Sequence, residues 1–186
     1  METLEKRRLG REDWIEAALQ ILFERGVTGI KVVVLAERLG VTSGSFYWHF
    51  KKVKDLLDAV LNHWEHQLTD HIIRDAREFS GPAEERIFLL MKQVVQEGAA
   101  EPDHAIAVWS KSDPGVQAVF QRTLQRRYDF AAGMFGQAGF AEDEARVRGR
   151  ILVAYLMGES SAGLKADRDW QVSLRRHWEV LVSRSV

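Results

Sequence analysis

The stretch that decides the fold is GVTGIKVVVLAERLGVTSGSFYWHF, residues 26–50. Its first part predicts a short amphipathic helix, because Val32, Leu35, Ala36 and Leu39 follow the spacing i, i+3, i+4, i+7. Gly40 should end this helix. Thr42 is placed to cap a second helix, and the first turn of that helix carries only small side chains, Ser43, Gly44 and Ser45. The stretch therefore predicts two short helices joined by a turn, with a second helix whose backbone can approach another molecule closely.

The end of the second helix combines an apolar side with a polar side. Phe46 and Phe50 are four residues apart and should pack inward, whereas the side chains between them offer polar tips. Small groups at one end and polar tips at the other suit base edges and phosphate oxygens. The stretch thus predicts a helix–turn–helix that docks on DNA. The expected contacts are Ser43, Gly44, Ser45 and Tyr47 in the major groove, with Thr42, Trp48, His49, Lys51 and Lys54 toward phosphates.

The distribution of charge favours the same partner. The whole chain has a formal net charge of −1, but residues 1–55 hold ten Lys and Arg against eight acidic residues. Basic residues flank the predicted motif at 6–8 and at 51–54, where they could reach backbone phosphates. Without the motif between them, these basic residues could equally well be solvated surface charges that contact no phosphate.

The motif resembles the N-terminal domain of the TetR (tetracycline repressor) family of bacterial regulators. The residues that carry the resemblance are Gly26, Ala36, Gly40, Val41, Tyr47, His49, Phe50, Lys54, Leu56 and Leu57. A looser similarity to one branch of the family extends through Trp109-x-x-x-Asp113-Pro114, Arg126-Arg127, Gly139-Phe140 and Tyr155-x-x-Gly158. The resemblance implies a dimeric, DNA-binding regulator joined by a four-helix bundle from the last two long helices of each chain.

The sequence departs from the family pattern at three places. Lys31 stands where Ser or Thr usually caps the first helix of the motif, so that helix start should lack a side-chain acceptor. Val33 and Val34 occupy positions that are often charged, and Val53 replaces a basic residue. Phosphate contacts near residue 53 are therefore expected from Lys51, Lys52 and Lys54, which surround it.

The chain as a whole predicts an all-α fold of about nine helices. It has 186 residues, of which 46% are hydrophobic and 28% charged, and Pro occurs only at 82, 102 and 114. Helical periodicity continues between the prolines. We expect a DNA-binding domain over residues 1–53 and a helical effector-binding and dimerisation domain over 54–186. The predicted helices cover 11–25, 32–39, 42–50, 54–79, 82–97, 102–110, 114–138, 142–164 and 169–183.

Several classes of protein and site are disfavoured. Cysteine is absent, which excludes disulfides and thiolate metal sites and fits a reducing compartment. There is no apolar run of about 18 residues and the first ten residues are too charged for a signal peptide, so we expect a cytoplasmic protein without a membrane span. No phosphate loop, dinucleotide fingerprint or nucleophile motif appears, so neither a cofactor nor an enzymatic activity is expected.

The last two long helices suggest a dimer. Residues 142–164 are apolar on two faces, one with Ile151, Tyr155, Gly158 and Ala162, the other with Leu152, Leu156 and Gly163. A single core needs one apolar stripe, so the second is expected to meet another copy of the chain. On the last helix Trp170, Leu174 and Trp178 extend the expected seam. The alternative is that both helices lie at the centre of a monomer.

A ligand pocket is expected beneath the helix at 54–79. At 100° per residue, His71 falls on the inward face of that helix, and Arg127 falls on an inward or partner-facing face of the helix at 114–138. One interpretation is that both bind a polar or anionic end of an apolar effector. The other is that His71 bonds a carbonyl and Arg127 pairs with an acid. The expected pocket residues are Trp64, His71, Phe88, Met91, Trp109, Arg127 and Tyr128.

A metal site is the least favoured possibility. His63, His66, Asp70 and His71 resemble a ligand cluster on one helix, but no second helical His pair supports it and His104 is distant. We therefore expect no metal. The leading hypothesis is an effector-controlled repressor that binds a palindromic operator as a homodimer. The alternatives are a DNA-binding architectural protein without effector, or a small helical enzyme or metal-binding bundle.

Overall fold

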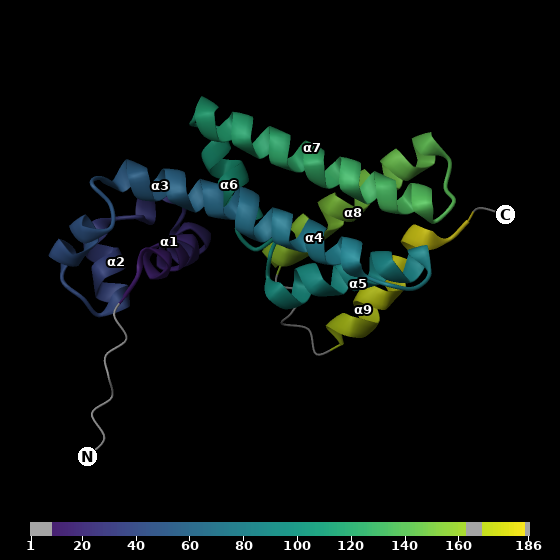
Figure 1. Cartoon of the computed structure of the whole chain (residues 1–186), viewed down its shortest axis with the longest axis horizontal. Coiled ribbons are helices and arrows are strands. Elements are labelled where there is room, and N and C mark those ends of the chain that lie inside the picture. Colours follow the sequence, from purple (N-terminus) through teal and green to yellow (C-terminus); the bar gives the residue numbers. More distant parts are fainter. Residues whose placement is uncertain (1–8, 163–168, 185–186) are drawn as a thin grey trace, which may run out of the picture. The chain divides into compact units, whose positions relative to one another are not determined.

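The computed structural model describes residues 9–162 and 169–184 (Figure 1). Within these residues there are nine α-helices, two short 3₁₀ segments, one π-helix and no strand. This confirms the predicted all-α class. Within the same residues, no helix combines the length and apolarity needed to cross a membrane.

The chain divides into two compact units, residues 1–63 and 64–186. We call them the N-terminal and C-terminal units. The division falls ten residues beyond the domain boundary expected from the sequence. The helix in between, α3 (Val53–Asn62), has its main contacts with α1 (Arg11–Arg25) in the N-terminal unit.

The N-terminal unit is built around one aromatic cluster. Its elements are α1, η1 (Val27–Gly29), α2 (Val32–Leu39), η2 (Ser43–Trp48) and α3. Trp14 of α1 is fully buried and meets Phe46 edge to face, with ring centroids 5.5 Å apart. Phe46 in turn stacks on Phe50 at 5.5 Å. The predicted inward packing of both phenylalanines is confirmed, and this packing attaches η2 to α1.

The turns of this unit follow the sequence with one correction. Gly40 ends α2 in the left-handed region at φ 67°, and Lys31 begins α2 without a side-chain cap, both as expected. The prediction that Thr42 caps η2 is wrong, because its hydroxyl makes no cap hydrogen bond. It lies 3.3 Å from the Ser45 hydroxyl instead. The backbone is held by Ser45 N–H, which donates to the Thr42 carbonyl.

The described residues of the C-terminal unit form seven helical elements. They are η3 (His63–Asp70, with His63 counted in the other unit), α4 (His71–Glu78), α5 (Ala83–Glu97), α6 (Asp103–Ser110), α7 (Pro114–Gln137), α8 (Glu142–Ala162) and α9 (Trp170–Val182). The most extensive packing is between α7 and α8. Pro114 opens α7 at its first turn, capped by the Asp113 carboxylate, which accepts from Gly115 N–H and Val116 N–H. The core lies between α4, α5, α7, α8 and α9.

The segment predicted as one helix over residues 54–79 is helical throughout but changes its type. Residues 63–70 form a π-helix between α3 and α4. Each π turn holds more residues than an α turn, so the faces of the helix rotate relative to a regular 3.6-residue pattern. Trp64 and Glu65 are buried, and the next buried residues are Thr69, five positions after Trp64, and Ile72. The inward face after residue 64 therefore differs from the one that the sequence predicts.

Candidate functional site

The outer side of η2 is the most exposed aromatic surface of the N-terminal unit. Trp48 is 88% exposed and Tyr47 is 62% exposed, and Val33 of α2 is 68% exposed. Such large apolar groups in water are unusual and mark a surface that meets a partner. Of the other expected DNA contacts, Thr42, Gly44, Lys51 and Lys54 are exposed, and Ser43, Ser45 and His49 are half-buried.

The basic residues after η2 differ in their surroundings. The Lys54 ammonium donates to both oxygens of Asp58 at 2.8 and 2.9 Å within α3. Lys51 makes no ion pair with any described residue and is exposed. Its charge is therefore available to a phosphate without the loss of an existing contact. The basic residues at 6–8 lie outside the described residues.

A small cavity lies inside the C-terminal unit. Its volume is about 60 Å³, which is enough for a few waters but well below the roughly 300–1,000 Å³ of typical ligand pockets. Three of its lining residues, Thr69, Asp103 and Arg127, are polar. The remainder are apolar: Leu68, Ile72, Ile73, Leu90, Val94, Ala99, Ala100, Phe130, Ala131, Leu152, Val153, Leu156 and Met157.

The three polar residues bond to one another at one end of the cavity. The Arg127 guanidinium donates to Asp103 Oδ2 at 2.6 Å and to Thr69 Oγ1 at 3.1 and 2.7 Å. Asp103 is fully buried, and its other oxygen accepts from the Trp64 indole N–H at 2.6 Å. Thr69 donates to the Trp64 carbonyl at 3.3 Å, so its hydroxyl uses its one donor and both acceptor positions. The polar end is thus hydrogen-bonded within the unit.

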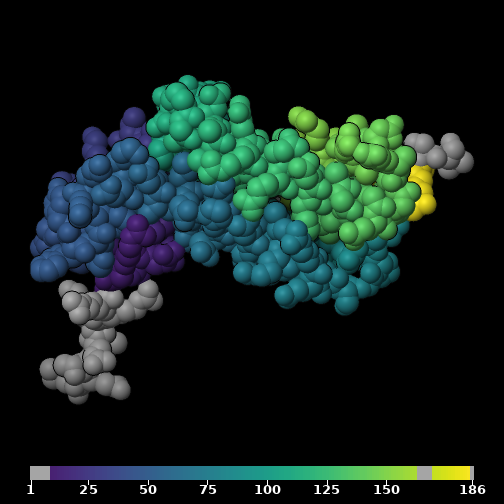
Figure 2. Space-filling model, turned by 45° about the horizontal axis from the view of Figure 1, so that its top comes forward, coloured from purple at the N-terminus to yellow at the C-terminus, as the bar shows by residue number. Residues whose placement is uncertain are grey.

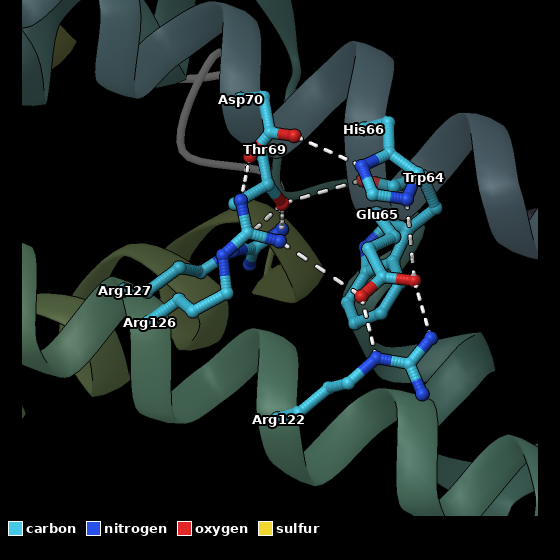
Figure 3. Close-up of polar contacts among 8 residues, drawn as sticks. All are labelled: Trp64, Glu65, His66, Thr69, Asp70, Arg122, Arg126 and Arg127. Carbon is cyan, nitrogen blue, oxygen red and sulfur yellow. Dashed lines mark hydrogen bonds and ion pairs between the residues drawn. The ribbon is translucent and has the colours of Figure 1, made fainter.

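A second ionic group ties η3 to α7 (Figure 3). Glu65 is almost fully buried and accepts two hydrogen bonds from Arg122, at 2.7 and 2.6 Å. Arg126 donates to Asp70, which also contacts His66 at 2.9 Å. The Arg122 hydrogen bond lowers the pKa of Glu65, against the opposing effect of burial. The carboxylate therefore remains charged at neutral pH and holds η3 to α7.

Most of the predicted pocket residues do not line the cavity. Only Arg127 does, and its pairing with Asp103 is the second of the two interpretations that the sequence left open. Trp64, Met91 and Trp109 are buried elsewhere in the core. Phe88 packs on Trp178, with ring centroids 5.7 Å apart, and Tyr128 lies under the Arg150 guanidinium at 4.8 Å.

The expectation that His71 points inward is wrong. Its side chain is 42% exposed and lies 3.3 Å from Asp75 and 3.6 Å from Glu97. The π-helix is the cause, because the extra residues per turn rotate position 71 away from the face of Trp64. The sequence also missed Thr69 and Asp103. Asp103 follows a proline at a helix start, where an acidic residue is ordinarily explained as a first-turn charge.

The histidines considered as metal ligands have separate partners. His63 contacts Glu12 at 2.7 Å in the N-terminal unit, whereas His66 contacts Asp70 in the C-terminal unit. His71, Asp75 and Glu97 bring one potential ligand atom each within 4.8 Å of one another. The Gln93 amide holds both carboxylates, donating to Asp75 at 3.1 Å and to Glu97 at 3.0 Å. The four histidine and aspartate side chains that the sequence places along one helix flank therefore do not converge on one point.

The two faces of α8 separate as the sequence predicts. Leu152 and Leu156 are buried in the unit, while Ile151 is 52% exposed. Gly158 and Ala162 are also exposed, and Tyr155 is half-buried against the His177 ring. Gly163, expected on the inner face, lies outside the described residues.

The seam expected on α9 needs a correction. Leu174 is fully buried in the core of its own unit, and the Trp178 indole donates to the Glu84 carbonyl of α5 at 2.8 Å. Trp170 also packs against this core. The apolar residues that α9 exposes are Val172 and Val180. Apolar spacing shows that a helix has such a face, but it does not identify which face meets its own chain.

Sequence similarity to known proteins is found in the N-terminal unit. Residues 15–60 match the model of the family described as bacterial regulatory proteins, tetR family. The chain is 45% identical to the class D tetracycline repressor protein of Escherichia coli over 53 residues, which cover 28% of this chain and 24% of the repressor. The match thus covers about a quarter of that relative.

Similarity in fold extends over nearly the whole chain. A transcriptional regulator from Saccharomonospora viridis in complex with choline has a TM-score of 0.71 at 18% identity, covering 92% of this chain and 94% of its own. The regulator FadR from Bacillus subtilis in complex with stearoyl-CoA has a TM-score of 0.65 at 19% identity, covering 94% and 98%.

The fold and the exposed face of η2 define a helical protein with an N-terminal helix–turn–helix and a C-terminal helical unit that contains a small, partly open cavity. The match to the tetR family of bacterial regulatory proteins lies in residues 15–60, within the N-terminal unit. Along the rest of its length it has the fold of solved transcriptional regulators.

Proposed function

We propose that this protein is a cytoplasmic transcriptional repressor that binds a palindromic operator as a homodimer and is released by a small effector. The observation that carries the proposal is the outer face of η2. Phe46 and Phe50 fix η2 on Trp14, and this leaves Tyr47 and Trp48 exposed within the stretch that matches the tetR family. A short helix held from behind and small at its first turn fits the major groove, and the lysines after it fit the phosphates.

The second part of the proposal is the dimer. On α8, the exposed residues Val147, Ile151, Ala154 and Gly158 follow the spacing of one helix face. Val172 and Val180 add exposed apolar area on α9. We infer that a second copy of the chain covers these exposed apolar residues. Gly158 would allow close approach of two helices, since nothing lies within 4 Å of a Cβ built there.

The third part is the effector. The cavity supports an effector that is largely apolar, because only its Arg127 end is polar. Two regulators of similar fold are described with small molecules, choline in one and stearoyl-CoA in the other. Since the cavity is small, an effector would have to enlarge it by moving the surrounding helices.

We propose that η3 transmits this change. The boundary between the two units falls inside this π-helix, and its residues Glu65, Thr69 and Asp70 are all bonded to α7. π-Helical segments are uncommon and often lie at functional sites. An effector that separates α7 from η3 would weaken these bonds and alter the segment that leads to α3. The change in operator affinity is then limited by the difference between the effector's affinities for the DNA-binding and the DNA-released conformations.

The test is a DNA-binding assay with and without effector. Operator candidates are selected from random double-stranded DNA by the purified full chain, and the selected sites are examined for twofold symmetry and salt dependence. A compound library is then screened for release of the selected DNA. Failure to select any sequence would contradict DNA recognition, and selection without any releasing compound would favour the architectural alternative. Ser45→Phe should change the preferred sequence if Ser45 contacts bases; an equal loss on all sites would argue against that contact.

A further inference from the structure

The cavity of the C-terminal unit borders a surface groove. The groove has a volume of about 630 Å³ and lies between α4 and α7, which adjoin on the face seen in Figure 2. Ile73 of α4 and Phe130 of α7 line both the cavity and the groove. These two residues therefore form a shared wall, and a displacement of either would widen the path between the cavity and the groove.

The interior of the cavity offers no charge to a ligand. Arg127 is paired with Asp103, and the remaining polar lining residue, Thr69, is bonded to Arg127. A charged group placed here would have to break this buried pair or stay unpaired, and both are costly. The rest of the described lining is apolar. The part of a ligand that enters the cavity should therefore be a neutral, apolar chain.

The groove, in contrast, is positive at its surface. It is lined by three arginines and two aspartates: Arg74, Arg77, Arg126, Asp70 and Asp129. Arg126 is bonded to Asp70, and Arg74 donates to His71 at 3.0 Å and lies 3.7 Å from Asp75.

Arg77 differs from the other two arginines. Among the described residues no carboxylate pairs with it, and its guanidinium lies 5.8 Å from the centre of the Phe130 ring. Arg77 thus combines an unpaired cation with contact to the shared wall.

We propose that this groove binds the anionic head of an amphiphile, a phosphate or a carboxylate, while the apolar chain passes between Ile73 and Phe130 into the cavity. The inference rests on the proposed effector role of the cavity and assigns the head of the ligand to Arg77, not to Arg127. An anion at Arg77 would compete with Phe130 for the guanidinium and so free the ring to move. Head and chain then act on the same wall.

The test uses four probes that share a ten-carbon chain, kept below their micelle concentrations. Decyl phosphate and decanoate carry an anionic head, decanol a neutral one and decyltrimethylammonium a cationic one. Binding to the full chain is measured by calorimetry, with methyl phosphate as a head without a chain. We expect at least one anionic probe to bind about tenfold more tightly than decanol, as one charge-assisted contact allows, and methyl phosphate to bind poorly.

Variants at Arg77 separate this site from general electrostatics. Arg77→Gln should remove the advantage of the anionic head, whereas the control Arg146→Gln, an exposed arginine of α8 outside the groove, should keep it. Arg77→Glu should reverse the preference toward decyltrimethylammonium, a result that loss of folding cannot produce. Equal binding of all heads, unchanged by Arg77→Gln, would overturn the proposal, as would failure of every probe to bind. Operator binding by the protein without probe is measured in parallel, because its loss would contradict the proposed function instead.

Discussion

The two units differ in how far apolar spacing predicts them. In the N-terminal unit, regular spacing correctly places Phe46 and Phe50 inside, and η2 is oriented by this packing. In the C-terminal unit, the same reasoning fails after Trp64, because a π-helix changes the period and brings Thr69 inward in place of His71. The π-helix η3 is held to α7 by buried polar contacts that no sequence motif predicts. The comparison suggests that the first unit is specified by apolar pattern and the second also by buried ionic contacts.

The buried pair at the end of the cavity provides the strongest test. Asp103→Ala leaves Arg127, only 15% exposed, without its carboxylate, so the free energy of unfolding should fall by about 3–5 kcal/mol. Urea denaturation followed by circular dichroism measures this. The double variant Asp103→Leu with Arg127→Met removes both charges and should recover much of the loss. If Asp103→Ala lowered the free energy of unfolding by less than about 1 kcal/mol, the buried pair would not be a structural requirement. The two units would then differ less in what specifies their folds.

The packing of α7 on α8 is the next largest effect. A Cβ at Gly149 would lie 2.7 Å from the backbone nitrogen of Ala132, so Gly149→Ala should destabilise the protein by about 1–3 kcal/mol. On α7, Gly136→Ala meets nothing within 4 Å and should be neutral or stabilising by up to about 1 kcal/mol. Thermal unfolding of the two variants makes the comparison. Similar melting temperatures would mean that α7 and α8 separate readily.

The sequence predicts the structure well where apolar residues follow a regular helical spacing. The helices, the motif of the N-terminal unit and the two faces of α8 follow from apolar spacing and from glycine and proline positions. The partner of Arg127 does not, since Asp103 lies 24 residues away and resembles a first-turn acid. The sequence also does not show which face of α9 packs inward. Two apolar faces of a helix look equivalent until the neighbouring helices are placed, and here Leu174 faces the core of its own unit.

The proposed dimer gives the third prediction. Gly158→Leu would insert a side chain where two α8 helices are expected to approach, so the dimer should dissociate about tenfold more readily, with a parallel loss of operator affinity. Analytical ultracentrifugation measures the first and a gel shift the second. Gly136→Leu is the matched control, because Gly136 is also an exposed helical glycine with no atom within 4 Å of a built Cβ, but on α7. An unchanged dimer for Gly158→Leu would reject this interface.

The N-terminal unit provides the fourth prediction. Lys51→Ala should weaken binding to all DNA sequences alike and reduce the slope of log affinity against log salt by about one, because one phosphate contact is lost. Lys92→Ala, on α5 of the other unit, should leave the slope unchanged. The measurement is fluorescence anisotropy of labelled DNA over a salt series. If Lys51→Ala retained the full slope, the lysines after η2 would not be phosphate contacts.

The smallest expected effect concerns the pH dependence that Glu65 gives to the C-terminal unit. Its pKa lies below the ordinary glutamate value of 4.5, chiefly because Arg122 donates to the charged form. A group whose pKa is lower in the folded state stabilises that state above the unfolded pKa, and the contribution disappears as the pH falls through the folded pKa. Unfolding measured between pH 7 and pH 3 should therefore show a loss of stability below about pH 4.5 that is smaller in Glu65→Gln.

Glu24 serves as a matched case in the N-terminal unit, since Arg38 lowers its pKa in the same direction but the pair lies at the surface. Glu24→Gln should change the acid limb of the curve less than Glu65→Gln, because solvent screens an exposed pair. If the two variants behaved alike, the ionic contacts of η3 would contribute no more than a surface salt bridge.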